Sequence, residues 1–338
     1  ALGKTHYYGG LRKYQWAAMP LALHGVVALK DGATVQVKVG EDEGDPVFYI
    51  SDLLPHLAAK QNQKPLGNAI EGEQLNIWFG NIPYTAATED DEKTVKNHVL
   101  HLLHDKYGIT EADFMSAELS MVPAFKAKDV GFDRALLGSY GHDDRVCAYP
   151  AWKACLDETS DRHTVMIVLA DKEEIGSEGT TGMQSAIFTD LIDELAASFG
   201  VSSAAIRAHS KCLSADVTAA YDPNYPEVCE KNNSVFLSCG AGIMKFTGAR
   251  GKSGSNDANA EFLAYLRNLF DENGVVWQTG ELGKVDEGGG GTVAKFIAKF
   301  NIDTVDIGVP VISMHSPWEV VSKADLYENY LAFKAFIR

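Results

Sequence analysis

The stretch TVMIVLADKEEIGS, residues 164–177, decides the predicted fold. Its first seven residues are apolar or β-branched without alternation, which is typical of a strand buried on both faces of a parallel sheet. Two adjacent carboxylates, Glu173 and Glu174, follow almost directly after this run. Because open α/β sheets place their sites at the carboxyl ends of strands, this pair is a candidate site. A charged surface loop is the alternative.

The rest of the chain from about residue 131 alternates helical and strand patterns. Helices are expected at residues 144–156, 182–200, 257–273, 292–300 and 324–337, and strands at residues 211–216, 274–278 and 304–308. This alternation predicts an α/β fold with a mixed, mostly parallel sheet flanked by helices.

The first third of the chain is β-rich instead. The pair Asp31-Gly32 separates two strand patterns, residues 21–29 and 34–39, and predicts a hairpin. Further expected elements are strands at residues 47–50, 75–79 and 119–122 and a helix at residues 94–106. We therefore divide the chain into a β-rich domain, residues 1–125, and an α/β domain, residues 126–338.

The composition argues against several classes of partner. The 338 residues include 30 Lys and Arg and 46 Asp and Glu, which gives a net charge of −16. Nucleic acid and anionic membranes are therefore not expected as partners, because binding them starts from clustered positive charge. No apolar run approaches the roughly 18 residues of a membrane span. The five cysteines lack disulfide spacing, which favours a reduced, cytoplasmic protein.

Four side chains of types that can bind metals all follow apolar, strand-like runs: Asp143, Glu174, Asp216 and His315. Carboxylates and imidazole together suit zinc, manganese or cobalt, and the set is too rich in carboxylates for a structural zinc finger. It suits two divalent ions that share a bridging carboxylate. The structural alternatives are a helix cap for Asp143 and a hydrogen-bonded structural histidine for His315.

The order and spacing of several motifs resemble the aspartyl aminopeptidase and vacuolar aminopeptidase I family of dinuclear zinc exopeptidases, in a bacterial-type member. The motifs are YYGG at residues 7–10, HDDR at 142–145, KEEIGS at 172–177, SAD at 214–216, PN at 223–224, GSND at 254–257, GGGGT at 288–292 and MHS at 314–316. The resemblance covers essentially the whole chain. It implies a zinc exopeptidase-like catalytic domain, residues 126–338, with an inserted β-rich oligomerisation domain, residues 1–125.

The resemblance also implies a role for each metal-binding candidate. Asp143 would bridge two metal ions, Glu174 and Asp216 would bind one ion each, and His315 would complete one coordination shell. Glu173 would be the general base that takes a proton from the metal-bound water.

Two further residues are expected to bind substrate. Lys245 resembles the family's substrate-contacting lysine, and His56 resembles a histidine that reaches the active site of a neighbouring subunit. The implied assembly is a homo-oligomer in which dimers form a tetrahedral dodecamer.

The chain departs from the family pattern at two places. The family's first metal-binding histidine lies in a His-x-Asp motif upstream of the Tyr-Gly-Gly segment, and no such motif precedes residues 7–10 here. We expect this ligand and the first strands of the catalytic sheet upstream of residue 1. Ala219 stands where aspartate-specific members carry histidine, so neutral N-terminal residues are expected to be cleaved as well as Asp.

These observations predict a metal-dependent aminopeptidase that acts on peptides with two divalent ions, zinc first and cobalt or manganese as alternatives. Two other functions remain open at this point. One is a related metal-dependent deacylase that acts on a non-peptide amide. The other is a catalytically silent assembly subunit that lacks one metal ligand.

Overall fold

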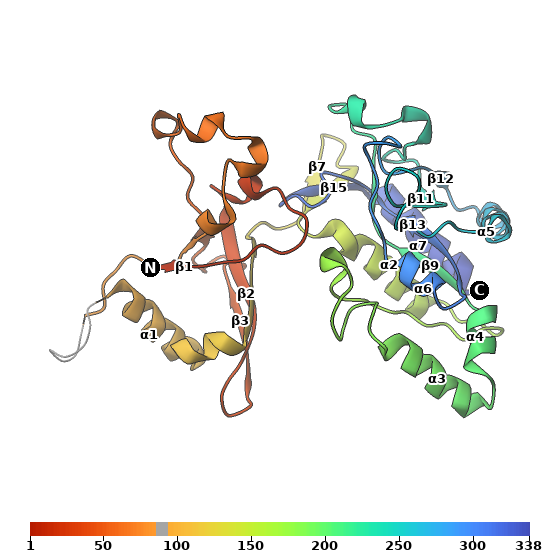
Figure 1. Ribbon diagram of the computed structural model, residues 1–338, viewed down its shortest axis with the longest axis horizontal. Coiled ribbons are helices and arrows are strands. Elements are labelled where there is room, and N and C mark those ends of the chain that lie inside the picture. Colours follow the sequence, from red (N-terminus) through yellow and green to blue (C-terminus); the bar gives the residue numbers. More distant parts are fainter. Residues whose placement is uncertain (86–93) are drawn as a thin grey trace. The chain divides into compact units, whose positions relative to one another are not determined.

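The computed structural model describes residues 1–85 and 94–338 (Figure 1). The chain divides into two compact units, Ala1–Ala127 and Lys128–Arg338. The sequence-based boundary after residue 125 lies two residues before this division. The roles assigned to the two domains remain predictions.

The first unit is built around one long strand, β2 (Pro20–Ala28). It pairs antiparallel with β3 (Thr34–Val39), β4 (Phe48–Tyr49) and β6 (Ala117–Pro123). The predicted hairpin around Asp31-Gly32 is present, and the backbone N–H of Ala33 donates to Asp31 Oδ1 over 2.9 Å. Its other regular elements are the pair β1 (Leu2–Gly3) and β5 (Ile77–Trp78) and helix α1 (Val95–Tyr107). Short 3₁₀ helices lie at Lys13–Trp16, Pro55–Leu57, Gln61–Gln63, Leu66–Asn68, Gly72–Gln74 and Glu111–Ser116.

The second unit contains two mixed sheets. One has the order β12 (Trp277–Thr279), β11 (Ala241–Met244), β13 (Asp303–Gly308), β9 (Lys211–Ala215). The other has the order β10 (Thr218–Ala219), β14 (Pro310–Ile312), β15 (Glu319–Ser322), β8 (Leu136–Ser139), β7 (Lys128–Val130). Strands β9 and β13 are parallel, as are β11 with β12 and β10 with β14, and the remaining pairs are antiparallel.

Helices flank these sheets, which confirms the predicted α/β class (Figure 1). They are α2 (His142–Asp157), α3 (Ile187–Phe199), α4 (Ser203–His209), α5 (Ala260–Glu272), α6 (Ala294–Ala298) and α7 (Lys323–Ile337). The apolar face of α5, with Phe262, Leu266 and Phe270, is buried in the same core as Val305 and Ile307 of β13. This packing fixes the strand that runs beside the candidate site.

The prediction of a strand at residues 164–170 is wrong for the described structure. Val168 and Leu169 are 45% and 65% exposed, and the segment ends in a single bridge between Asp171 and Gly182. No strand within residues 1–85 or 94–338 pairs with residues 164–170. An apolar, β-branched composition suits a strand, but a strand forms only where a neighbour satisfies its backbone hydrogen bonds.

Smaller differences concern the ends of helices. Helix α3 begins at Ile187 rather than residue 182, and α6 is a short helix of five residues within the predicted 292–300. Strands β8, β14 and β15 were given no bounds from the sequence, although the runs before Asp143 and His315 were expected to be strand-like. Each has only three or four residues, which is too short for a period-two pattern to be recognised. Within the part of the chain that the structure describes, helices long and apolar enough to cross a membrane are absent.

Candidate metal centre

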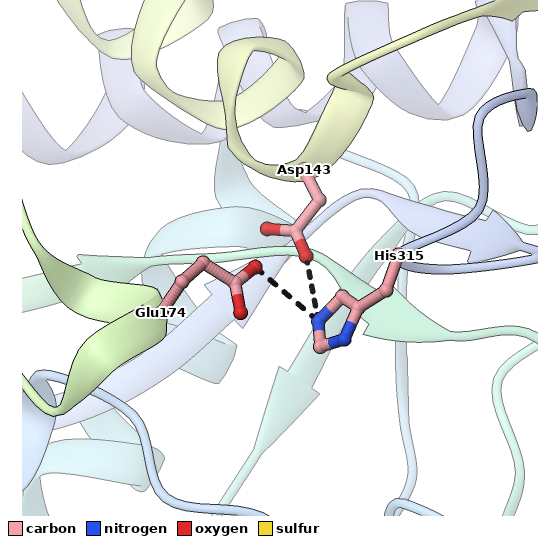
Figure 2. Close-up of side chains that lie close together, drawn as sticks. All are labelled: Asp143, Glu174 and His315. Atoms are coloured by element: carbon pink, nitrogen blue, oxygen red, sulfur yellow. Dashed lines mark ion pairs between the residues drawn. The ribbon is translucent and has the colours of Figure 1, made fainter. Parts of the chain in front are cut away.

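Three predicted metal ligands come together from three distant segments of the chain (Figure 2). Asp143 lies at the start of α2, Glu174 in a short 3₁₀ helix, η7 (Glu173–Ile175), and His315 in the turn that follows β14. Figure 2 shows the three side chains pointing toward one another. His315 Nε2 is 3.1 Å from Asp143 Oδ2 and 3.3 Å from Glu174 Oε1.

The glutamate pair is held by a tight turn. Lys172 before it and Gly176 after it both have left-handed backbones, with φ values of 66° and 95°. The N–H of Gly176 donates to the carbonyl of Glu173 over 2.8 Å, and the N–H of Ser177 donates to the carbonyl of Lys172 over 2.7 Å. Glycine at position 176 suits this geometry because it tolerates positive φ without steric cost. The turn therefore keeps both glutamates at the edge of the site.

A buried carboxylate, Glu319, holds the backbone of two of the predicted ligands. Its Oε2 accepts the backbone N–H of Asp143 over 3.1 Å, and its Oε1 accepts the backbone N–H of His315 over 2.7 Å. Glu319 is only 2% exposed, and burial raises its pKa while these N–H donors lower it. The sequence analysis missed this residue. The available signal is its place four residues after His315, as the first residue of β15.

A second group of carboxylates shares Asp143 with the first. Oxygens of Asp143, Asp144 and Asp216 lie within 4.8 Å of one another. Burial raises the pKa of both Asp144 and Asp216 well above the usual range, and the neighbouring carboxylates raise them further. Asp144 was not among the predicted ligands, and its Oδ1 is a buried atom without a hydrogen-bond partner in the described residues.

The electrostatics of both groups fit divalent cations. Burial raises the pKa of Glu174 to about 7. Among the described residues, no lysine or arginine forms an ion pair with Asp143, Glu174 or either aspartate of the second group. Packed carboxylates repel one another, and His315 is the basic side chain that pairs with them in the described residues. Bound cations would therefore stabilise a site of this composition. The donors are those that zinc, manganese and cobalt accept.

The remaining predicted residues occupy different places. Glu173 lies in η7 beside Glu174, and burial followed by the charge of Asp143 raises its pKa. Lys245, which follows β11, forms an ion pair with Asp257. His56 belongs to the other unit, in the 3₁₀ helix Pro55–Leu57. The structure thus brings the four predicted ligands into two groups that share Asp143, and Glu173 lies next to Glu174 in the chain. Glu173, Lys245 and His56 are not members of either group.

Comparison with known proteins agrees with this class of site. The family described as "Aminopeptidase I zinc metalloprotease (M18)" matches residues 2–337. A relative from Clostridium acetobutylicum named "Probable M18 family aminopeptidase 1" is 49% identical over 341 residues, covering 100% of this chain and 73% of the relative. The chain thus spans about three quarters of that relative's length.

Solved structures give the same result. The M18 aminopeptidase from Thermotoga maritima superimposes with a TM-score of 0.95 at 42% identity, covering 100% of this chain and 75% of that one. A more distant likeness, 22% identical with a TM-score of 0.70, is to a structure described as the S. cerevisiae mApe1 dodecamer, with 97% and 71% of the two chains covered. At that identity the likeness shows the fold alone.

The fold and the carboxylate-rich site therefore define a metal-dependent peptidase. The chain belongs to the M18 family of aminopeptidase I zinc metalloproteases. The predicted family and the predicted enzyme class, a hydrolase of peptide bonds, are confirmed.

Replacing Glu319 with Gln is expected to weaken retention of metal by about 10- to 100-fold, as for other partners of metal ligands. The amide keeps one acceptor oxygen, so it can hold the N–H of either Asp143 or His315 and not both. Metal content after dialysis against graded chelator concentrations measures the effect. Glu328→Gln is the matched control, because Glu328 also accepts a backbone N–H, that of Val276, over 2.8 Å. Equal metal retention in both variants would contradict this role.

Proposed function

We propose that this protein is an aminopeptidase that works with two divalent ions per protomer, zinc in the first place and cobalt or manganese as alternatives. The observation that carries the proposal is the pair of donor groups that share Asp143. In this assignment both ions would share Asp143, Glu174 and His315 would hold one of them, and Asp216 would hold the other. This is more donor capacity than one catalytic ion with an open position requires.

Bound ions would supply Lewis-acid chemistry, polarising the scissile carbonyl and lowering the pKa of water. The protein's own contribution to proton transfer comes from Glu173. It lies next to the ligand Glu174 but is not a member of either donor group. We assign it to take a proton from the attacking water and to deliver that proton to the leaving amine.

Peptides with a free N-terminus are the proposed substrates. A deacylase acting on a non-peptide amide would use the same donors, and membership of an aminopeptidase family favours the peptidase. A silent assembly subunit would not need intact ligands. The convergence of Asp143, Glu174 and His315 therefore supports an active enzyme.

The two neighbouring glutamates are expected to respond differently to the same substitution. Glu173→Gln should lower kcat by on the order of 10² or more with two ions still bound, because an amide keeps the shape and cannot accept the proton. Glu174→Gln should instead lower the metal content, because it removes a ligand. Elemental analysis beside kcat for full-length, metal-supplemented protein separates the outcomes. Equal loss of metal in both variants would refute the division of roles.

Neutral N-terminal residues are expected to be cleaved at least as well as acidic ones. The methyl side chain of Ala219, in β10, offers no donor to a buried carboxylate, and burying an unpaired carboxylate is costly. The test compares kcat/KM for Leu-, Ala-, Glu- and Asp-terminated peptides, with an N-acyl amino acid as the deacylase control. A preference for Asp above about tenfold, worth roughly 1.4 kcal/mol, would contradict this expectation. Cleavage of the N-acyl substrate alone would favour the deacylase.

We further propose that residues 1–125 mediate a homo-oligomer of dimers arranged as a tetrahedral dodecamer. The structure described as a dodecamer shares the fold, and three leucines beside His56 are exposed. Leu53, Leu54 and Leu57 are 51%, 50% and 68% exposed, which suits a surface that is covered in an assembly. In this arrangement His56 contributes to the site of a neighbouring subunit.

The mass of the full-length protein at micromolar concentration tests this assembly. Light scattering is expected to give a multiple of the protomer mass, and Leu57→Asp should lower it, because a charge on an apolar contact is expensive to desolvate. The melting temperature of the Leu57→Asp variant is the control for folding. It should stay close to that of the unsubstituted protomer, because Leu57 is exposed. A monomeric mass for the unsubstituted protein would refute the proposal.

The cytoplasm is the proposed location. The cysteines at positions 147, 155, 212, 229 and 239 are all free thiols in the described structure. Free thiols, including the exposed Cys239, are typical of a reducing compartment.

A further inference from the structure

Two motifs that the proposed function does not use come together around one carboxylate. They are GSND at residues 254–257 and GGGGT at residues 288–292. Asp257, the last residue of GSND, forms ion pairs with two lysines. Lys245 Nζ contacts Asp257 Oδ1, and Lys252 Nζ lies 3.0 Å from Asp257 Oδ2. Because two cations share one carboxylate, the group of three side chains carries one net positive charge.

The backbone holds Lys245 and Asp257 beside each other. Phe246 and Asp257 form an antiparallel bridge. The N–H of Ala258 donates to the carbonyl of Lys245 over 2.8 Å. Hydrogen bonds from Lys245 and then from Lys252 lower the pKa of Asp257, so its carboxylate stays ionised. The contact between Lys245 and Asp257 is therefore supported by neighbouring backbone and does not depend on two long side chains meeting by chance.

A closed turn presents Lys252 to the same carboxylate. The N–H of Ala249 donates to the carbonyl of Ser253 over 3.2 Å, and the N–H of Ser253 donates to the carbonyl of Ala249 over 3.0 Å. The ammonium of Lys252 lies 4.0 Å from the ring centre of Phe246, where a cation–π contact is favourable. A turn, a ring and a carboxylate thus hold Lys252 in place.

The glycine motif supports this turn from the other side. The N–H of Gly248 donates to the carbonyl of Gly290. Gly289 has a φ of 109°, and a Cβ at that position would collide with the carbonyl oxygen of Gly248. Glycine is required there because the two backbones approach closely and φ is positive. The GGGGT motif therefore helps to fix the segment that carries Lys252.

The shared carboxylate has a consequence for Lys245. All three charged side chains are exposed, so a ligand can reach them. If Asp257 paired with Lys245 alone, the two charges would cancel and the carboxylate would compete with any ligand oxygen for the ammonium. Since Lys252 takes up part of that negative charge, Lys245 keeps the capacity to form a charge-assisted hydrogen bond with a ligand.

We propose that Lys252 is a positioning residue that keeps Lys245 available to an oxygen of the peptide substrate by sharing the charge of Asp257. The inference rests on the proposed peptidase function and on the substrate contact predicted for Lys245. Asp257 directs the ammonium of Lys245, and Lys252 acts through Asp257 without touching the substrate.

Substitutions that keep the shape of the side chains and change their charge test this role. Lys252→Gln removes the second cation, while its amide can still donate to Asp257. We expect KM for a peptide with an N-terminal leucine to rise by about three- to tenfold, because the hydrogen bond from Lys245 to the substrate weakens. The kcat and the metal content of the full-length, metal-loaded enzyme should stay nearly unchanged. Lys245→Gln should raise KM at least as much, and Lys252→Arg should keep it close to the original value.

A double variant separates charge from structure. Asp257→Asn combined with Lys252→Gln returns the group to one positive charge, that of Lys245. KM is expected to fall back to within about threefold of the unsubstituted enzyme, which is a strong coupling in a double-mutant cycle. A salt bridge with a purely structural role predicts the opposite, namely a double variant no better than Lys252→Gln.

Lys211→Gln is the matched control. Lys211 also pairs with one aspartate, Asp303 at 3.3 Å, and its ammonium lies 5.1 Å from the ring centre of Phe262. The side chains of Lys211 and Lys252 are 41% and 43% exposed, so both lysines lose the same kinds of contact on substitution. KM should not change in Lys211→Gln.

Any of three results would overturn the inference. They are an unchanged KM in Lys252→Gln or Lys245→Gln, an equal rise of KM in Lys211→Gln, and a double variant without recovery. Failure of the proposed function is distinguishable from all of these. It would show as no cleavage of the peptide by the unsubstituted, full-length, metal-loaded enzyme.

Discussion

Repulsion among carboxylates around Asp143 is the constraint on which the rest of the site depends. Asp143 belongs to two donor groups at once. Burial, followed by the charges of neighbouring carboxylates, raises the pKa of Asp144, Asp216 and Glu174. Folding alone gains nothing from gathering these groups, because each loses hydration and repels its neighbours. Bound cations convert the same arrangement into a stable one. The fold must therefore hold these carboxylates close together, and bound metal would stabilise them in that arrangement.

The scaffold imposes this arrangement of carboxylates through hydrogen bonds to the backbone of the predicted ligands rather than to their side chains. Glu319 receives an N–H from Asp143 and another from His315, so one buried side chain joins the start of α2 to the turn after β14. A closed turn between Lys172 and Gly176 holds the glutamates in the same way. Ligands presented by hydrogen-bonded turns hold their positions at a lower cost in conformational entropy than ligands on free loops.

The sequence predicts the members of this site better than it predicts the elements that carry them. Asp143, Glu174, Asp216 and His315 could be found because each is a metal-binding residue type beside an apolar run. The prediction of a strand at residues 164–170 failed because a strand needs neighbours as well as a suitable composition. No strand within the described residues pairs with this segment. Glu319 was missed for a related reason. Glu319 acts by accepting two backbone N–H groups, and a pattern of side-chain types in the sequence does not reveal such contacts.

The adjacent glutamates show where structure adds what sequence leaves undecided. Glu173 and Glu174 are the same residue type in one 3₁₀ turn, and only the family resemblance assigns them different roles. In the structure their surroundings differ. Glu174 Oε1 lies 3.3 Å from the imidazole of His315, which places it among the donors. Glu173 forms no such pair in the described residues. Burial and the charge of Asp143 raise its pKa, and the charges of His315 and Lys295 oppose this rise. A carboxylate that is free of the donor groups can exchange a proton, whereas one that coordinates a metal cannot do so without losing it.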